Sequence, residues 1–135
     1  MDYPQLKKKI LIADDEQDVI MILGRILSSG YDLETHSNSN SVHDRLFNPI
    51  HKSRESLGLD MLILDNSMGG DHKGADLAGK AVLVYPSLPI LVTSGEDIAH
   101  DYPHIVQAGV KIYRKPYDLV YLKGVIKELL HGEKQ

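Results

Sequence analysis

The feature that most constrains the fold is a series of short apolar runs that recur along the chain. They begin near residues 10, 31, 60, 89 and 110, so that successive runs are 21 to 29 residues apart. Residues 10–13, 61–64 and 90–93 resemble central strands buried on both faces, because no charged residue interrupts them. Residues 31–36 alternate in the manner of a half-exposed strand, and residues 110–113 are expected to form a fifth.

Between these runs, apolar residues recur at the three- and four-residue spacing of helices. The helices are expected at residues 19–27, 41–47, 75–85, 97–107 and 117–130, whereas residues 49–58 are polar and carry no clear periodicity. One strand and one helix therefore fit each step, which is the βα repeat. Right-handed crossovers then produce an open, five-stranded parallel sheet with helices on both faces, an α/β fold.

The length of 135 residues favours a single domain, with a core at about residues 8–131. Hydrophobic residues make up 42% of the chain and charged residues 25%, as in an ordinary soluble globule. The absence of cysteine excludes disulfide frameworks, Fe–S clusters, zinc fingers and cysteine nucleophiles.

The charge pattern gives no reason to expect binding to nucleic acid or to a membrane. The net charge is −4, and the pI is near 5.9. The three lysines at residues 7–9 precede only four apolar residues, too few for a signal peptide or a membrane span. We therefore expect a cytoplasmic protein.

Polar residues stand where the expected strands end. The first strand is followed by Asp14 and Asp15, the third by Asp65, the fourth by Thr93 and Ser94, and the fifth by Lys115 and Pro116. Ligands of open α/β sheets bind outside the carboxyl ends of the strands. Three carboxylates, a hydroxyl and an ammonium group are therefore expected at one edge of the sheet.

This set of side chains favours phosphoryl chemistry that depends on a metal. Three neighbouring aspartates call for a cation, and oxygen ligands favour a hard ion such as Mg²⁺. A carboxylate beside that ion can act as a nucleophile and form an aspartyl phosphate. Thr93 and Lys115 would then hold the phosphoryl oxygens.

The order and spacing of these pieces resemble the receiver domain of two-component response regulators over the whole chain. The matching segments are residues 10–15, 60–65 with Met68, 91–94, and 108–116. The resemblance implies a flavodoxin-like sheet with strand order 2-1-3-4-5. It also implies that Asp65 is the phosphoacceptor, that Asp14, Asp15, Asp65 and the backbone carbonyl of Ser67 hold Mg²⁺, and that Thr93 and Lys115 are the switch hydroxyl and the phosphate-binding lysine.

The resemblance further implies a stand-alone, regulatory switch rather than an enzyme that turns over external substrates. A sensor histidine kinase or a histidine phosphotransfer protein would phosphorylate Asp65. Because no output domain follows Leu130, the output is expected to be protein–protein contact through the fourth helix, fifth strand and fifth helix, or onward transfer in a phosphorelay.

Several positions depart from the family pattern. Gly69 stands where proline is usual, and Gly74 is displaced by one residue, so we expect a more mobile loop after Asp65. Ile112 occupies the place of the family's aromatic switch, and Tyr113 is expected on the opposite face of a regular strand, unless a bulge restores it. The peptide bond before Pro116 is usually cis in the family.

Three other interpretations stay open. A phosphohydrolase with an aspartyl phosphate commonly has a second acid two residues after its nucleophile, but Ser67 stands there. A degenerate receiver would bind partners without being phosphorylated. His100 and His104 have a spacing that suits zinc, but Pro103 lies between them and no third ligand is evident. His72 is expected to be an exposed loop residue.

Overall fold

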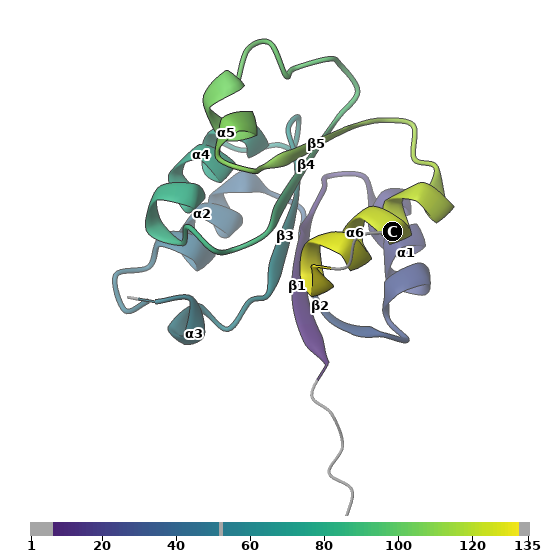
Figure 1. The fold of residues 1–135 in the computed structure, drawn as a ribbon, viewed down its shortest axis with the longest axis horizontal. Helices are drawn as coiled ribbons and strands as arrows, with labels where there is room; N and C mark the ends of the chain where they lie inside the picture. The colour runs from purple at the N-terminus through teal and green to yellow at the C-terminus, as the bar shows by residue number, and fades with distance from the viewer. Residues whose placement is uncertain (1–6, 52, 133–135) are drawn as a thin grey trace, which may run out of the picture.

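The expected five-stranded parallel sheet is present in a computed structural model of the chain, which describes residues 7–51 and 53–132 (Figure 1). Its strands are β1 (Lys8–Ala13), β2 (Tyr31–His36), β3 (Met61–Asp65), β4 (Ile90–Ser94) and β5 (Lys111–Arg114). All are parallel, and their order, β2-β1-β3-β4-β5, confirms the flavodoxin-like prediction. The extent of the domain stays a prediction, and residues 1–6 and 133–135 lie outside the described residues.

Helices cover both faces of the sheet, as Figure 1 shows. On one side lie α2 (Ser39–Phe47), α4 (Gly74–Val84) and α5 (Pro103–Gln107); on the other lie α1 (Gln17–Leu27) and α6 (Leu119–His131). The short helix α3 (Arg54–Leu57) precedes β3. The repeat of strand and helix therefore produces the layers that the sequence predicts.

Two apolar clusters, one on each face of the sheet, hold these layers together. In β1, Leu11 belongs to the cluster beneath α2 and α4, whereas Ile10 and Ile12 belong to the cluster beneath α1 and α6. All three side chains are fully buried, and residues of β3 alternate in the same way. Because side chains of a strand point alternately to opposite faces, burial of both faces requires continuous apolar runs.

The helices differ from the sequence prediction mainly at their ends. Helix α3 was not predicted, because its four residues are too few for an apolar periodicity; the Ser53 side chain caps it by accepting from Ser56 N. The helix expected at residues 97–107 is present only as α5, with Pro103 in its first turn. Helix α6 begins at Leu119, after the cap Asp118.

Strand β5 is regular, so the bulge considered above is not there. Its residues pair with β4 without interruption, and Thr93 lies opposite Tyr113. Ile112 packs against the cluster beneath α2 and α4, whereas Tyr113 belongs to the other cluster. The two side chains therefore lie on opposite faces, as predicted. The Lys115–Pro116 peptide bond is cis, which also confirms the expectation.

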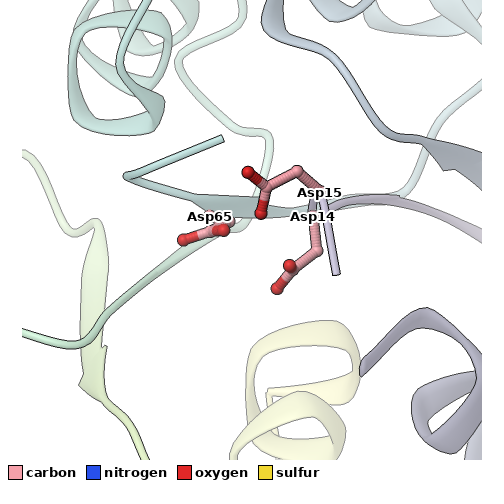
Figure 2. Close-up of side chains that lie close together, drawn as sticks. All are labelled: Asp14, Asp15 and Asp65. Carbon is pink, nitrogen blue, oxygen red and sulfur yellow. The ribbon is translucent and has the colours of Figure 1, made fainter. Parts of the chain in front are cut away.

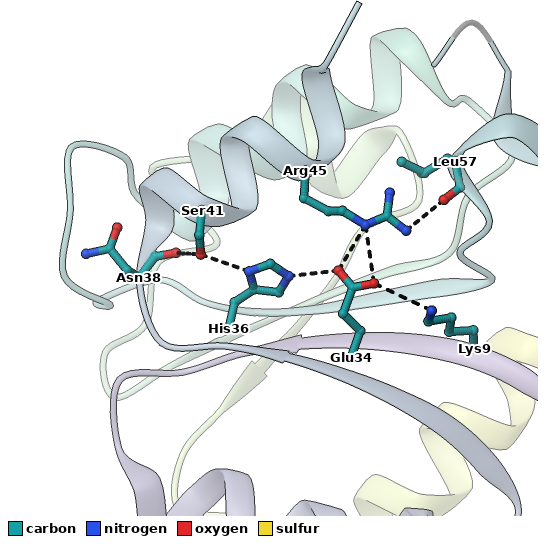
Figure 3. A network of polar contacts seen from close by, with 7 residues as sticks. All are labelled: Lys9, Glu34, His36, Asn38, Ser41, Arg45 and Leu57. Atoms are coloured by element: carbon teal, nitrogen blue, oxygen red, sulfur yellow. Dashed lines mark hydrogen bonds and ion pairs between the residues drawn. The ribbon is translucent and has the colours of Figure 1, made fainter. Parts of the chain in front are cut away.

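A network of charged side chains links α2 to β2, which is an edge strand of the sheet (Figure 3). Glu34 accepts from Arg45 Nε at 3.0 Å, lies 2.8 Å from His36 Nε2, and lies 3.7 Å from Lys9 Nζ. Arg45 also donates to the carbonyl of Leu57 at 2.8 Å. This carboxylate is thus surrounded by basic side chains, and α2 is tied to both β2 and α3.

No helix in the described residues 7–51 and 53–132 has both the length and the apolar character needed to cross a membrane.

Candidate functional site

Three aspartates meet at the carboxyl edge of the sheet, where the neighbouring strands β1 and β3 end (Figure 2). Each of Asp14, Asp15 and Asp65 offers a carboxylate oxygen, and these oxygens all lie within 4.8 Å of one another. Asp14 and Asp65 are each 2% exposed, whereas Asp15 is open to solvent. The register of β1 and β3 pairs Ala13 with Leu64, so the residues that follow must come together.

Backbone N–H groups fix the two buried carboxylates. Asp14 Oδ1 accepts from Glu16 N at 2.9 Å, and Asp65 Oδ1 accepts from Ser67 N at 3.2 Å. Each bond closes a tight turn two residues beyond the aspartate, a conformation that aspartate favours. The turns leave the second oxygen of each carboxylate to contact other partners, as Asp14 Oδ2 contacts Lys115.

Among the residues that the structure describes, Lys115 is the cation that pairs with this cluster. Its Nζ lies 3.2 Å from Asp14 Oδ2, 3.5 Å from Asp65 Oδ1 and 3.8 Å from Glu16 Oε1. The side chain is 18% exposed, so the contacts are partly shielded from water. A single ammonium group cannot neutralise three close carboxylates, and the site keeps an excess of negative charge.

This excess changes the proton affinities at the site. Burial raises the pKa of Asp65, and the charges of Asp14 and Asp15 raise it further, although the Ser67 N–H and Lys115 oppose them. The pKa of Lys115 is also raised: burial lowers it, but interactions with Tyr117, Asp65 and Asp14 outweigh that effect. The carboxylates therefore favour an additional cation at neutral pH.

The donor set fits a hard divalent cation such as Mg²⁺. Its donors are carboxylate oxygens, which Mg²⁺ prefers, and they are close enough to share one ion. Within residues 7–51 and 53–132, no other group of three or more potential metal ligands of the Asp, Glu, His and Cys types converges. No third ligand therefore joins His100 and His104 among these residues, so the structure does not support a zinc site there. Ser67 follows in the exposed turn, and its carbonyl as a ligand stays a prediction.

Thr93 lies beside the acceptor candidate on β4. It is the register partner of Asp65, and its carbonyl accepts from Asn66 N at 2.8 Å. Its side chain is 1% exposed, and Oγ1 has no hydrogen-bond partner of good geometry among the described residues. A buried hydroxyl without a partner is uncommon. Here it is available to an incoming oxygen.

Tyr117 is a site residue that the sequence analysis did not single out. Its ring centroid lies 5.8 Å from Lys115 Nζ, and its ring stacks on Tyr113 at 5.6 Å. Burial raises the pKa of Tyr117, while contacts with Thr93 and Lys115 lower it. A tyrosine two residues after the lysine was the only signal, and its sequence position does not reveal where the phenol points.

His72 differs from its expected exposure. It is half-buried, and its ring stacks on that of His43 with centroids 4.5 Å apart. The loop between β3 and α4 therefore contacts α2, a contact that joins residues far apart in the sequence. The open cleft beside Asn66 has a volume of about 470 Å³ and is lined by residues of this loop together with Ser94 and Glu96.

Comparison with known proteins agrees with this geometry. The sequence model of the response regulator receiver domain matches residues 10–127. A search of curated protein sequences found no match.

Solved structures with this fold cover nearly the whole chain. The HemR receiver domain of Leptospira biflexa has a TM-score of 0.76 at 21% identity, covering 96% of this chain and 98% of its own. A CheY-like receiver domain protein of Methanospirillum hungatei JF-1 has a TM-score of 0.74 at 22% identity, covering 93% and 95%. TrrA of Thermotoga maritima, solved with Mg²⁺ and BeF, has a TM-score of 0.73 at 24% identity, covering 91% and 99%.

Proposed function

This chain belongs to the response regulator receiver domain family, a regulatory family of two-component signalling, and from that premise we propose that Asp65 is its phosphoacceptor. A histidine kinase or a histidine phosphotransfer protein donates the phosphoryl group. The observation that carries the proposal is the convergence of Asp14, Asp15 and Lys115 on Asp65. Three carboxylates with one ammonium group favour the binding of a divalent cation. That cation and the ammonium group would together favour an anionic phosphoryl group beside them.

In the proposed reaction, a carboxylate oxygen of Asp65 attacks the phosphorus atom of the donor. An O–P bond forms, the bond between phosphorus and the donor nitrogen breaks, and its electron pair leaves with the imidazole. Asp14, Asp15, Asp65 and the Ser67 carbonyl would hold Mg²⁺, which would supply positive charge to neutralise the phosphoryl oxygens. The hydrogen bond from Ser67 N to Asp65 Oδ1 holds the nucleophile in place.

Lys115 and Thr93 supply the remaining contacts to the phosphoryl group. The Lys115 ammonium would exchange part of its pairing with Asp14 and Asp65 for a phosphoryl oxygen. Among the described residues, the Thr93 hydroxyl contacts the Tyr117 phenol but forms no hydrogen bond of good geometry, so it can turn to donate to another oxygen. The resulting movement of Thr93 would carry the signal from the site to the rest of the molecule.

The proposed output surface is formed by α5, β5 and α6, the equivalents of the family's fourth helix, fifth strand and fifth helix. Exposed apolar side chains lie on it, including Val106 on α5 and Tyr121 on α6. A cleft of about 330 Å³ lies between β5 and α6 and is lined in part by Lys111 and Arg114. Phosphorylation would change the affinity of this surface for a protein target in the cytoplasm.

Intact-mass measurement after incubation with Mg²⁺ and a small acyl phosphate tests this proposal. We expect wild type to gain one phosphoryl group, Asp65→Asn to gain none, and a metal chelator to abolish the gain. Asp71→Asn is the matched control, because Asp71 is an exposed aspartate in the adjacent loop. Equal labelling of wild type and Asp65→Asn would refute Asp65 as the acceptor. Rapid turnover of simple phosphate esters would favour the phosphohydrolase instead.

A further inference from the structure

We propose that the N-terminus of α2 positions the loop between β3 and α4, and that Ser39 is a positioning residue for Mg²⁺ binding. This inference rests on the proposed function, because the loop carries Ser67 and begins directly after Asp65. Neither Ser39 nor its neighbours lie near the metal site in the sequence.

Backbone groups of the loop bond to two consecutive residues of α2. Ser39 N donates to the carbonyl of Gly69 at 2.8 Å, and His72 N donates to Ser39 Oγ at 3.0 Å. Asp71 N donates to Asn40 Oδ1 at 3.1 Å. Ser39 is fully buried, so its contacts are shielded from solvent, whereas the bond to Asn40 is exposed. The middle of the loop thus depends on α2 for its backbone hydrogen bonds.

The loop and the helix approach so closely that only glycine fits at the contact. Gly70 has a φ of 112°, which other residues rarely adopt. A Cβ at Gly70 would overlap with Ser39 Oγ. Two adjacent glycines give residues 69–70 little conformational preference of their own. Contacts from outside the loop must therefore select its conformation, and α2 supplies them.

A contact between two imidazole rings also attaches the end of the loop to α2. The imidazole of His72 stacks on that of His43 with centroids 4.5 Å apart and planes 4° apart. Lys80 of α4 fixes His43 in turn, with Nζ 3.3 Å from His43 Nε2. Both the main chain and a side chain of the loop therefore rest on α2.

The two ends of the loop are fixed without α2. Asn66 Oδ1 accepts from Ala75 N at 2.9 Å, and a Cβ at Gly74 would meet the backbone of Asp65. The turn from Asp65 to Ser67 and the burial of Met68 hold the start of the loop as well, so residues 69–72 are the part that could take several paths. The bonds to Ser39 and Asn40 select one path for these residues, and so support the turn that holds the Ser67 carbonyl near Asp65.

The test compares Ser39→Ala with Ser41→Ala. Ser41 lies on the same turn of α2 but bonds to His36 and to the Asn38 carbonyl, not to the loop. We measure the rate of phosphorylation by a small acyl phosphate as a function of Mg²⁺ concentration. For Ser39→Ala we expect the half-saturating Mg²⁺ concentration to rise about tenfold, as for other partners that orient metal ligands, with the rate at saturating Mg²⁺ nearly unchanged.

A second pair of variants keeps the test decisive if Ser39→Ala does not fold. Asn40 is only half-buried; Asn40→Ala removes the acceptor for Asp71 N, whereas Asn40→Asp retains it. We expect Asn40→Ala to raise the half-saturating Mg²⁺ concentration and Asn40→Asp to restore it. A merely structural role would lower the unfolding temperature of both serine variants without separating their Mg²⁺ dependence.

Each outcome decides one of the two proposals. Equal Mg²⁺ dependence of Ser39→Ala and Ser41→Ala, in a wild-type protein that is phosphorylated, would overturn the positioning role alone. If wild type takes no phosphoryl group, the proposed function is wrong; Mg²⁺ titration of the unfolding temperature then decides the positioning role, which requires weaker binding in Ser39→Ala than in Ser41→Ala.

Discussion

Two clusters of charged side chains differ in their balance of acidic and basic groups: acidic groups are in excess in one and basic groups in the other. Around Asp65, the carboxylates of Asp14, Asp15 and Asp65 lie close together (Figure 2), and the ammonium group of Lys115 pairs with Asp14 and Asp65. Around Glu34, one carboxylate contacts three basic side chains, those of Lys9, His36 and Arg45 (Figure 3). The two clusters lie on the same sheet, one at its carboxyl edge and the other on its edge strand.

The pKa values of Asp65 and Glu34 reflect this difference in neighbouring charge. Burial raises the pKa of both carboxyl groups, and at Asp65 the raised pKa persists, since neighbouring aspartates add to the effect. At Glu34, hydrogen bonds from His36 and Arg45 outweigh burial and hold the pKa below its usual value. The negative charge of Glu34 is therefore compensated by basic side chains of the protein, whereas the three carboxylates around Asp65 keep an excess of negative charge. The first has the character of a structural network and the second that of a binding site.

Removing a cation from the cluster around Glu34 should have the largest effect on stability. Arg45→Ala leaves Glu34 without its guanidinium partner and removes the bond to the Leu57 carbonyl. We expect the free energy of unfolding to fall by about 2–3 kcal/mol, measured by urea denaturation. The control Arg25→Ala removes an exposed arginine and should cost less than about 0.5 kcal/mol. Similar losses for both variants would show that the cluster contributes nothing.

Neutralising the Glu34 carboxylate should also be destabilising. Glu34→Gln is expected to cost about 1.5–2 kcal/mol at neutral pH. Because the folded pKa of Glu34 is lowered, its contribution is full above the pKa of a free glutamate and disappears as pH falls through the folded value. The difference between wild type and variant should thus shrink in acid. Glu55→Gln, at an exposed position, should show no such pH dependence.

Addition of Mg²⁺ should stabilise the cluster around Asp65. At ten times the dissociation constant, wild type should gain about 1.4 kcal/mol in the free energy of unfolding. Glu34→Gln should show the same increment, whereas Asp15→Asn should show a smaller one at the same Mg²⁺ concentration. Thermal unfolding with and without Mg²⁺ measures these increments. An increment that survives unchanged in Asp15→Asn would place the ion elsewhere.

Neutralising a carboxylate of the cluster around Asp65 should change the free energy of unfolding in the opposite direction to Glu34→Gln. Without Mg²⁺, Asp65→Asn is expected to raise the free energy of unfolding at pH 7 by on the order of 0.5–1 kcal/mol. The folded pKa of Asp65 is raised, so ionisation destabilises the folded state as pH rises through that value. The gain should therefore vanish in acid, below the pKa of a free aspartate. If Asp65→Asn lowered the free energy of unfolding at pH 7, the proposed excess of negative charge around Asp65 would be wrong.

The sequence predicts the parts of this molecule that depend on local patterns. Continuous apolar runs such as residues 10–13 and 61–64 identify buried strands, since both faces of a parallel sheet are covered. Once the strands are assigned, the polar residues that follow them must meet at one edge. Asp14, Asp65 and Lys115 therefore come together where the sequence analysis expects them.

Features that depend on contacts between distant residues could not be predicted in this way. The bond from His72 N to Ser39 Oγ joins residues 33 positions apart, and no periodicity records it. Helix α3 is only one turn long and is stabilised by the Ser53 cap, which also lies outside any apolar pattern. The place of the Tyr117 phenol beside Lys115 depends on the path of the chain after Pro116.

Locating the phosphoryl group on the chain is the most direct test of the central claim. After reaction with an acyl phosphate and Mg²⁺, borohydride reduces an aspartyl phosphate at its carbonyl, and peptide sequencing by mass spectrometry then identifies the reduced residue. We predict a single reduced aspartate at Asp65, which disappears when Mg²⁺ is chelated before the reaction. Reduction at another acidic residue, or no reduction in a protein that has gained a phosphoryl group, would contradict the account.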